Sequence, residues 1–381
     1  MSDKRNIAIA LPSVGEREYE ALRIPIESGW LTQGPQVAAF EKEFSEYQEA
    51  DHALAVTSAT TGLHLALVAM GVGPGDEVIV PSFTWIATAN VVEYCGAKPV
   101  FADVDLSTFN IDVNHAASLV TERTKAVIPV HLFGMPADMD GLRAALPKHV
   151  LILEDAACGA GCVYKGRKVG AIGDAGVFSF HPRKTITTGE GGMVTTNNTE
   201  LFTRADMLRN HGASISEEQR HHGAQPYILP DFNLLGFNYR MTDFQGAVGR
   251  TQLERLEEFI QDRAKWAAWY AAELSEIEWL SLPYEPDGGR HSWQAFVTYV
   301  DPEKAPLPRN EIMKRLMERG ISTRPGTHAV HLQEYYVGKY SIAPDALPRA
   351  RDCQNQTMAI PLHNRMNEDD FNYIVAELKS I

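Results

Sequence analysis

The sequence is poor in cysteine and has no long apolar run. Its four cysteines, Cys95, Cys158, Cys162 and Cys353, are scattered over 381 residues. The Cys158/Cys162 spacing lacks the second pair that a tetrahedral zinc site requires, so we expect reduced thiols and no metal. No stretch reaches the roughly 18 uninterrupted apolar residues of a membrane helix, which argues against a membrane protein.

Basic residues are also scarce. Lys and Arg number 35 against 49 Asp and Glu, and the formal net charge is −14. Since nucleic acid binds basic surfaces, it is not an expected partner. The N-terminus lacks the basic-then-apolar pattern of a secretion signal, which predicts a cytoplasmic protein.

Short β-branched runs alternate with helical stretches between residues 50 and 200. This alternation predicts an α/β fold with a mostly parallel sheet covered by helices on both faces. The runs are 77–81, 99–102, 126–130, 150–153, 176–179 and 192–196. In such sheets ligands bind beyond the carboxyl ends of the strands.

The C-terminal part predicts a second domain. Thr242 and Gln245 match a capping box that starts a long helix, and a strand, a helix and a final amphipathic helix follow it. We therefore predict a large domain over residues 1–246 and a small α+β domain over 247–381. The stretch 212–240 reads as a long functional or partner-contacting loop, with His221 and His222 on its surface and not in a metal site.

Two residues that follow predicted strands can carry chemistry. Asp155 ends the run 150–154, and Lys184 lies in a polar, glycine-bearing loop after the run 176–179. A buried carboxylate can keep a pyridine nitrogen cationic, and a lysine can form an imine and move a proton; together these roles describe pyridoxal phosphate (PLP) chemistry. Taken singly, the acid is equally a helix cap or half of an ion pair, and the lysine a solvated side chain.

The segment from Ser58 to Gly62 leads directly into a predicted helix. Backbone N–H groups and hydroxyls at such a helix start suit a phosphate. The alternative is that Ser58 or Thr60 merely caps the helix. The glycine-rich stretch 71–76 follows a helix and precedes a strand, the reverse of the order in dinucleotide sites, and predicts a turn.

Seven blocks spread over nearly the whole chain resemble the sugar aminotransferases of the DegT/DnrJ/StrS family. The blocks begin with Ser28-Gly-Trp-Leu-Thr-Gln-Gly34, Ser58-Ala-Thr-Thr-Gly-Leu-His-Leu-Ala-Leu67 and Gly75-Asp-Glu-Val-Ile-Val-Pro-Ser-Phe-Thr-Trp85. They continue with Glu154-Asp-Ala-Ala157, Ser179-Phe-His-Pro-Arg-Lys184, Thr188-Gly-Glu-Gly-Gly192 and Gly236-Phe-Asn-Tyr-Arg-Met241. The resemblance implies PLP-dependent transferase fold type I, with a mostly parallel seven-stranded-type sheet in the large domain and a smaller α+β C-terminal domain.

The resemblance also implies roles around the cofactor ring. Lys184 would form a covalent imine with PLP, and Asp155 would pair with the ring nitrogen. Trp85 would stack on the ring, and Cys158, where relatives often carry His or Gln, would lie beside the ring hydroxyl.

Further implied roles concern the cofactor phosphate and the substrate. Thr60, Thr61 and Ser179 would hold the phosphate, and Asn238 would reach it from the neighbouring subunit of a homodimer with shared active sites. The candidates for substrate contacts are His328, Trp30 and Glu190; for His328 the alternative is an ordinary loop histidine.

The implied activity is transfer of an amino group from L-glutamate, through the pyridoxamine (PMP) form of the cofactor, to a keto-deoxy sugar for cell-surface polysaccharide or natural-product biosynthesis. The blocks look closest to enzymes that make nucleotide-linked 4-amino sugars such as perosamine. An aminotransferase of an 8-keto octulosonate sugar acid stays open, as does a PLP-dependent sugar dehydratase, although some dehydratase relatives carry histidine where this chain has Lys184. A non-enzymatic relative is a third possibility, which the intact Asp155 and Lys184 oppose.

Overall fold

The computed structural model describes residues 5–215 and 227–381. Its main sheet has seven strands in the order β1-β10-β9-β6-β5-β2-β4. Their bounds, in that order, are His52–Val56, Gly192–Thr196, Ala175–Ser179, Leu151–Asp155, Thr124–Val127, Glu77–Pro81 and Lys98–Ala102. Only β10 runs antiparallel to its two neighbours. The prediction of a mostly parallel sheet is therefore confirmed.

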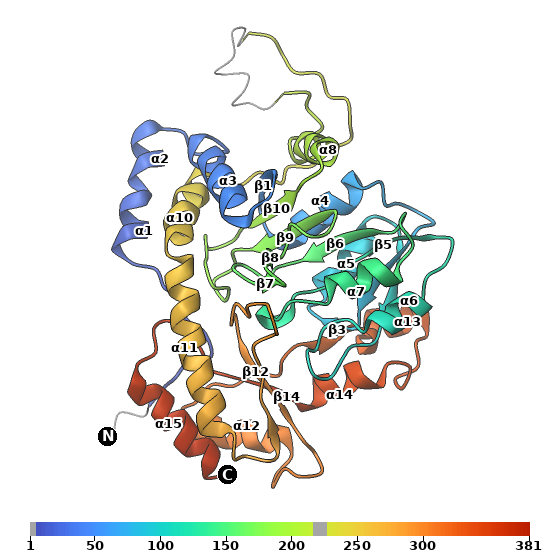
Figure 1. The fold of residues 1–381 in the computed structure, drawn as a ribbon. Helices are drawn as coiled ribbons and strands as arrows, with labels where there is room; N and C mark the ends of the chain where they lie inside the picture. The colour runs from blue at the N-terminus through green and yellow to red at the C-terminus, as the bar shows by residue number, and fades with distance from the viewer. Residues whose placement is uncertain (1–4, 216–226) are drawn as a thin grey trace.

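Helices cover both faces of this sheet (Figure 1). One face packs on α4 (Ala59–Ala69), α5 (Ala87–Tyr94) and α8 (Thr199–Arg209), and the other on α3 (Pro35–Gln48) and α7 (Met139–Ala145). On β6, Ile152 belongs to the second core and Leu153 to the first, because successive side chains of a strand point to opposite faces. The described residues of this part also form α1 (Glu16–Ala21), α2 (Arg23–Ser28), α6 (Val113–Ser118) and a short 3-10 helix, η1 (Leu132–Gly134).

The C-terminal part builds a third core around a three-stranded antiparallel sheet. The strands are β11 (Leu280–Ser281), β12 (Phe296–Val300) and β14 (Thr357–Ile360), packed with α11 (Leu256–Leu274), α12 (Arg309–Glu318) and α15 (Glu368–Lys379). The predicted capping box is present, but the long helix is divided at Arg255 into α10 (Asp243–Glu254) and α11. The predicted domain boundary after residue 246 falls within α10 and stays a prediction.

One C-terminal segment returns to the part of the chain that carries the seven-stranded sheet. Strand β13 (His328–Ala329) pairs with β3 (Phe83–Thr84), with His328 opposite Thr84. The helices α13 (Glu334–Tyr340) and α14 (Pro348–Gln356) follow it, and Tyr336 and Cys353 are buried in the same core as α4 and α5. Residues far apart in sequence therefore meet beside β3.

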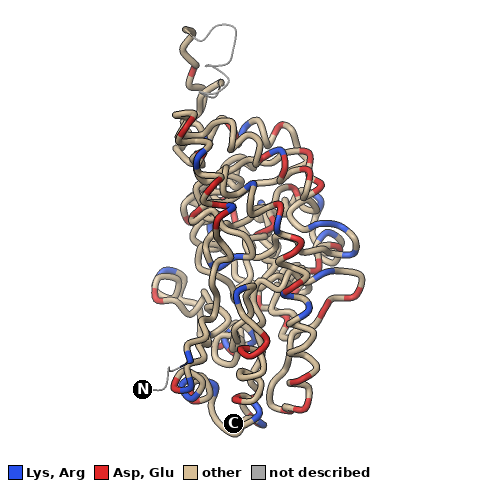
Figure 2. Tube along the Cα trace, turned by 90° about the vertical axis from the view of Figure 1, so that its left-hand side faces the viewer, with Lys and Arg blue, Asp and Glu red and all other residues tan. Residues whose placement is uncertain are grey.

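The turn at residues 71–76 and several smaller features can also be compared with the sequence predictions. The stretch 71–76 forms a turn after α4, in which Gly71 has a φ of 76° and the Asp76 amide donates to the Gly73 carbonyl. A short hairpin joins β7 (Val163–Tyr164) and β8 (Arg167–Lys168). His221 and His222 lie outside the described residues. In the described part of the chain, no helix is both long and apolar enough to cross a membrane, and basic and acidic residues are interspersed along the trace (Figure 2).

Candidate active site

Asp155 is the last residue of β6 and lies at the carboxyl end of the parallel strands. Its side chain is buried; Oδ2 accepts a hydrogen bond from Thr88 Oγ1 of α5 at 2.8 Å, and Oδ1 accepts one from the Ala157 amide at 3.2 Å. Burial raises the pKa of Asp155, while these hydrogen bonds and the charge of Lys184 act in the opposite direction. A cation placed against this carboxylate would be held strongly, because water does not screen the pair.

Lys184 lies in the loop after β9, the strand that pairs with β6. The loop turns back on itself, with the Lys184 amide donating to the His181 carbonyl at 2.8 Å. The Lys184 Nζ donates to Cys158 Sγ at 3.1 Å. Since Cys158 lies three residues beyond Asp155, the structure brings the predicted imine lysine and the predicted acid into one site.

The start of α4 lies next to this site. Ser58 caps the helix by accepting from the Thr61 amide at 3.2 Å, and Thr61 Oγ1 donates to the Ser58 carbonyl at 2.8 Å. Ser179 pairs with Gly192 across β9 and β10, and a Cβ at Gly192 would lie 2.7 Å from Ala59 N. Ser179 is therefore brought to the helix start, where Thr60 and Thr61 also lie. Helix capping and a phosphate site are compatible here, since a cap satisfies only one of the free N–H groups.

Trp85 and His328 form an open rim. Trp85 directly follows β3 and is 56% exposed, and its ring centroid lies 5.8 Å from that of His328. The pairing of β13 with β3 delivers this histidine from the C-terminal part. An indole with a free face is suited to stacking on a flat ring.

The other predicted site residues, Asn238, Trp30 and Glu190, interact with residues other than Asp155, Cys158 and Lys184. Asn238 forms an antiparallel β-bridge with Asn210. The carbonyl of the neighbouring Tyr239 accepts a hydrogen bond from the Thr57 amide at 3.1 Å, so Asn238 lies near the start of α4 in its own chain. Its reach into a second subunit stays a prediction. Trp30 Nε1 donates to the Gln33 carbonyl at 2.9 Å. Glu190 is exposed, and its charge acts on the His181 imidazole of the lysine loop.

The structure adds residues that sequence reasoning missed. Ser292 Oγ donates to the Cys158 carbonyl at 3.0 Å, and Gln294 Nε2 donates to the Arg183 carbonyl at 2.8 Å. Both come from the segment before β12, so their proximity to the site is a consequence of the tertiary fold. A third case is Glu154, an acid inside an apolar run, which is fully buried against His131. For Glu154 the sequence did offer a signal, because an acidic residue follows directly on the apolar run 150–153.

Comparisons with known proteins agree with this geometry. Residues 12–379 match the DegT/DnrJ/EryC1/StrS aminotransferase family. The chain belongs to this family. It is 40% identical over 385 residues to the spore coat polysaccharide biosynthesis protein SpsC of Bacillus subtilis, covering 100% of this chain and 99% of that protein. It is 39% identical over 384 residues to GDP-perosamine synthase of Caulobacter vibrioides, covering 100% of both.

A solved structure extends the comparison to the cofactor. Spr1654 of Streptococcus pneumoniae has been solved in a PMP form, which matches this fold with a TM-score of 0.92 at 27% identity over 98% of both chains, and in a PLP form with a TM-score of 0.91. The chain is thus a PLP-dependent sugar aminotransferase of fold type I.

The residues present fit this cofactor. Among the described residues, no basic side chain is hydrogen-bonded to the buried Asp155 carboxylate, which therefore suits a cationic ring nitrogen. An amine lies in the adjacent loop, and an aromatic side chain is exposed. At the start of α4, Gly192 leaves room that a Cβ would fill. These four features match the nitrogen, aldehyde, ring and phosphate of PLP.

Proposed function

We propose that this aminotransferase moves an amino group from L-glutamate to the keto carbon of a deoxy sugar carried on a nucleotide, giving a 4-amino sugar of the perosamine type. The observation that carries the proposal is the meeting of Lys184, Cys158 and Asp155 at the ends of β6 and β9. The full-length similarity to a GDP-perosamine synthase supports the choice of acceptor.

Each residue has a defined task in this proposal. When bound, PLP supplies an aldehyde that takes up amines and a ring that accepts electrons from a breaking C–H bond. Asp155 would hold the ring nitrogen in its cationic form. Lys184 would bind the aldehyde carbon through Nζ and then use Nζ to carry a proton to and from the substrate carbon. Trp85 would cover the ring, and Cys158 would lie beside the ring hydroxyl.

Phosphate binding and dimerisation are linked in the proposal. Thr60, Thr61 and Ser179 would hold the cofactor phosphate at the start of α4, with Asn238 of a second subunit. A dimer is supported by residues 227–235, which project beyond the seven-stranded sheet (Figure 1) and expose five apolar side chains: Tyr227, Ile228, Leu229, Phe232 and Leu235. Leu229→Asp should convert a dimer to a monomer in analytical ultracentrifugation.

The substrate claims can be tested directly. Purified protein would be given L-glutamate with a panel of keto sugars, some nucleotide-linked and some free, including an 8-keto octulosonate. Mass spectrometry of an aminated nucleotide sugar together with 2-oxoglutarate would support the proposal. A dehydrated sugar without 2-oxoglutarate would favour the dehydratase alternative, and amination of the octulosonate alone would favour the sugar acid.

We further propose the cytoplasm as the place of this reaction. All four cysteines are free in the structure, as reduced thiols are in a reducing compartment. A His328 contact to the sugar or its phosphate, and contacts from Trp30 and Glu190, complete the proposed substrate site.

A further inference from the structure

Glu154 is a fully buried carboxylate directly beside Asp155 in sequence. Its Oε1 accepts hydrogen bonds from the amides of Ile172 and Gly173 at 2.8 and 2.6 Å, and its Oε2 accepts from the Gly170 amide at 2.7 Å and meets His131 Nε2 at 2.9 Å. Both oxygens thus face two donors each. Only an ionised carboxylate offers acceptors at all four positions.

His131 is equally buried, and its hydrogen bonds define its protonation. Nδ1 accepts from the Ala137 amide at 3.1 Å and therefore carries no proton. The ring proton is then on Nε2, where it is donated to Glu154. The pair holds one negative charge, surrounded by five hydrogen bonds of fixed direction.

This pair is tied to Asp155 through the backbone. The His131 amide donates to the Asp155 carbonyl at 3.0 Å, and the Asp155 amide donates to the Pro129 carbonyl at 2.8 Å. Glu154 and Asp155 are adjacent on β6, so their side chains point to opposite faces of the sheet. Glu154 therefore anchors the strand end from one face while Asp155 projects from the other.

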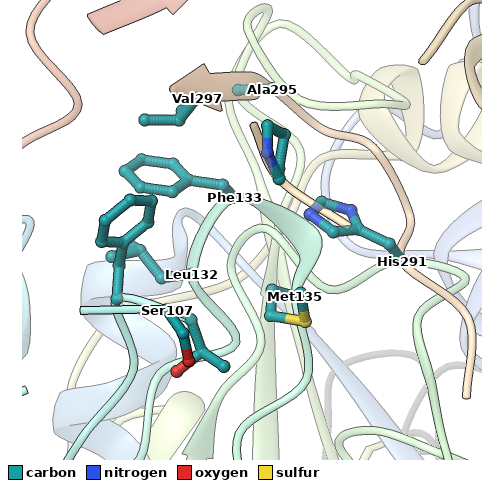
Figure 3. A pocket seen from close by; sticks show the side chains of 10 residues that line it. Ser107, Leu132, Phe133, Met135, His291, Ala295 and Val297 are labelled. Carbon is teal, nitrogen blue, oxygen red and sulfur yellow. The ribbon is translucent and has the colours of Figure 1, made fainter. Parts of the chain in front are cut away.

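The same carboxylate reaches the segment that leads to Lys184. Its three amide donors belong to the turn 170–173, which enters β9 and then the lysine loop. His131 in turn starts the loop in which Phe133 (φ 61°) faces Ala295 and Val297 across a small pocket (Figure 3). One buried charge thus joins the acid strand, the lysine strand and a loop that packs on the C-terminal domain.

We propose that Glu154, oriented by neutral His131, is a positioning residue that fixes the Asp155 carboxylate relative to the Lys184 amine. The inference rests on the cofactor roles proposed above for those two residues. Glutamine cannot replace Glu154, because in either amide orientation its NH₂ group would face two donors in place of an acceptor.

The test compares Glu154→Gln with Glu77→Gln in the full-length protein. Glu77 is a matched control because it is also buried and hydrogen-bonded, to Thr121 and Arg123, but lies at the start of β2, at the opposite end of the strands. Three measurements are made: hydrogen exchange of the cofactor-free protein, the absorbance of the PLP-loaded protein across pH, and kcat and KM.

For Glu154→Gln we expect faster exchange at the amides of residues 155 and 170–173, an absorbance and pH profile shifted toward that of Asp155→Asn, and kcat lower by roughly 10- to 100-fold. Glu77→Gln should change none of these. Unchanged exchange at these amides together with an unchanged PLP spectrum in Glu154→Gln would overturn the inference. Wild-type protein that gives no PLP absorbance would instead refute the proposed function, and the exchange result would still decide whether Glu154 holds Asp155.

Discussion

Two regions of the site differ in how far hydrogen bonds and burial fix their side chains: a floor formed by Asp155, Glu154 and His131, and a rim formed by Trp85 and His328. On the floor, Asp155, Glu154 and His131 are at most 5% exposed, and hydrogen bonds satisfy each of them. On the rim, Trp85 is 56% exposed, and His328 is exposed as well. The floor is set before any ligand binds, whereas the rim presents open surfaces to ligands. Chemistry common to the family should therefore depend on the floor, and substrate choice on the rim.

The largest effect should come from removing the Lys184 amine, which lies beside the floor. Lys184→Ala leaves no group to bind the aldehyde or move the proton, so 2-oxoglutarate release should fall by roughly 1,000-fold or more, and the near-visible imine absorbance should vanish. Lys165→Ala, in the exposed hairpin, is the matched control and should behave as wild type. An imine band that persists in Lys184→Ala would disprove the assignment.

The next largest effect should come from Asp155→Asn. The amide keeps the shape, since its oxygen can accept from the Ala157 amide while its NH₂ group donates to the Thr88 hydroxyl, but it supplies no charge to hold the ring nitrogen cationic. The fold should persist by circular dichroism, and kcat should fall by roughly 100-fold or more. Unchanged steady-state turnover would show that the floor carries no electrostatic role.

A change on the rim should separate substrate choice from chemistry. His328→Ala should raise KM for the sugar by roughly tenfold through loss of a polar contact, while the half-reaction with glutamate proceeds as in wild type. His149→Ala, on the loop before β6 at the opposite end of that strand, is the control. If the two half-reactions weaken equally, the histidine does not belong to the sugar site.

The smallest effect is on stability and depends on pH. Burial raises the pKa of Asp155 in the folded protein, so the folded state holds this proton more tightly than the unfolded chain. The resulting stability is complete below the unfolded pKa of about 3.9 and is lost as pH rises through the raised value. In the cofactor-free protein, the Tm of Asp155→Asn relative to wild type should thus increase by about 2 °C between acid and neutral pH. A difference that stays constant with pH would contradict this reasoning.

Within the site, the sequence predicted residues that follow regular strands and missed Glu154 and His131 on the floor, together with contacts that depend on tertiary packing. Asp155 and Lys184 follow strands of a regular sheet, and the carboxyl ends of parallel strands meet by construction. The contacts of Ser292 and Gln294 depend on how the C-terminal part of the chain packs, which no local pattern encodes. The division at Arg255 was missed likewise, since the apolar spacing continues across it while the backbone leaves the helix for one residue.

The anchoring of His328 has a consequence for motion. Its strand β13 is hydrogen-bonded to β3, and the Val330 amide that follows donates to the Ser82 carbonyl at 2.6 Å. A few residues earlier the same segment is bonded to the three-stranded sheet, where Arg324 forms a β-bridge with Ala359. His328 therefore lies on a short piece of chain that is held by both sheets, and a shift of one sheet against the other would be transmitted to this histidine.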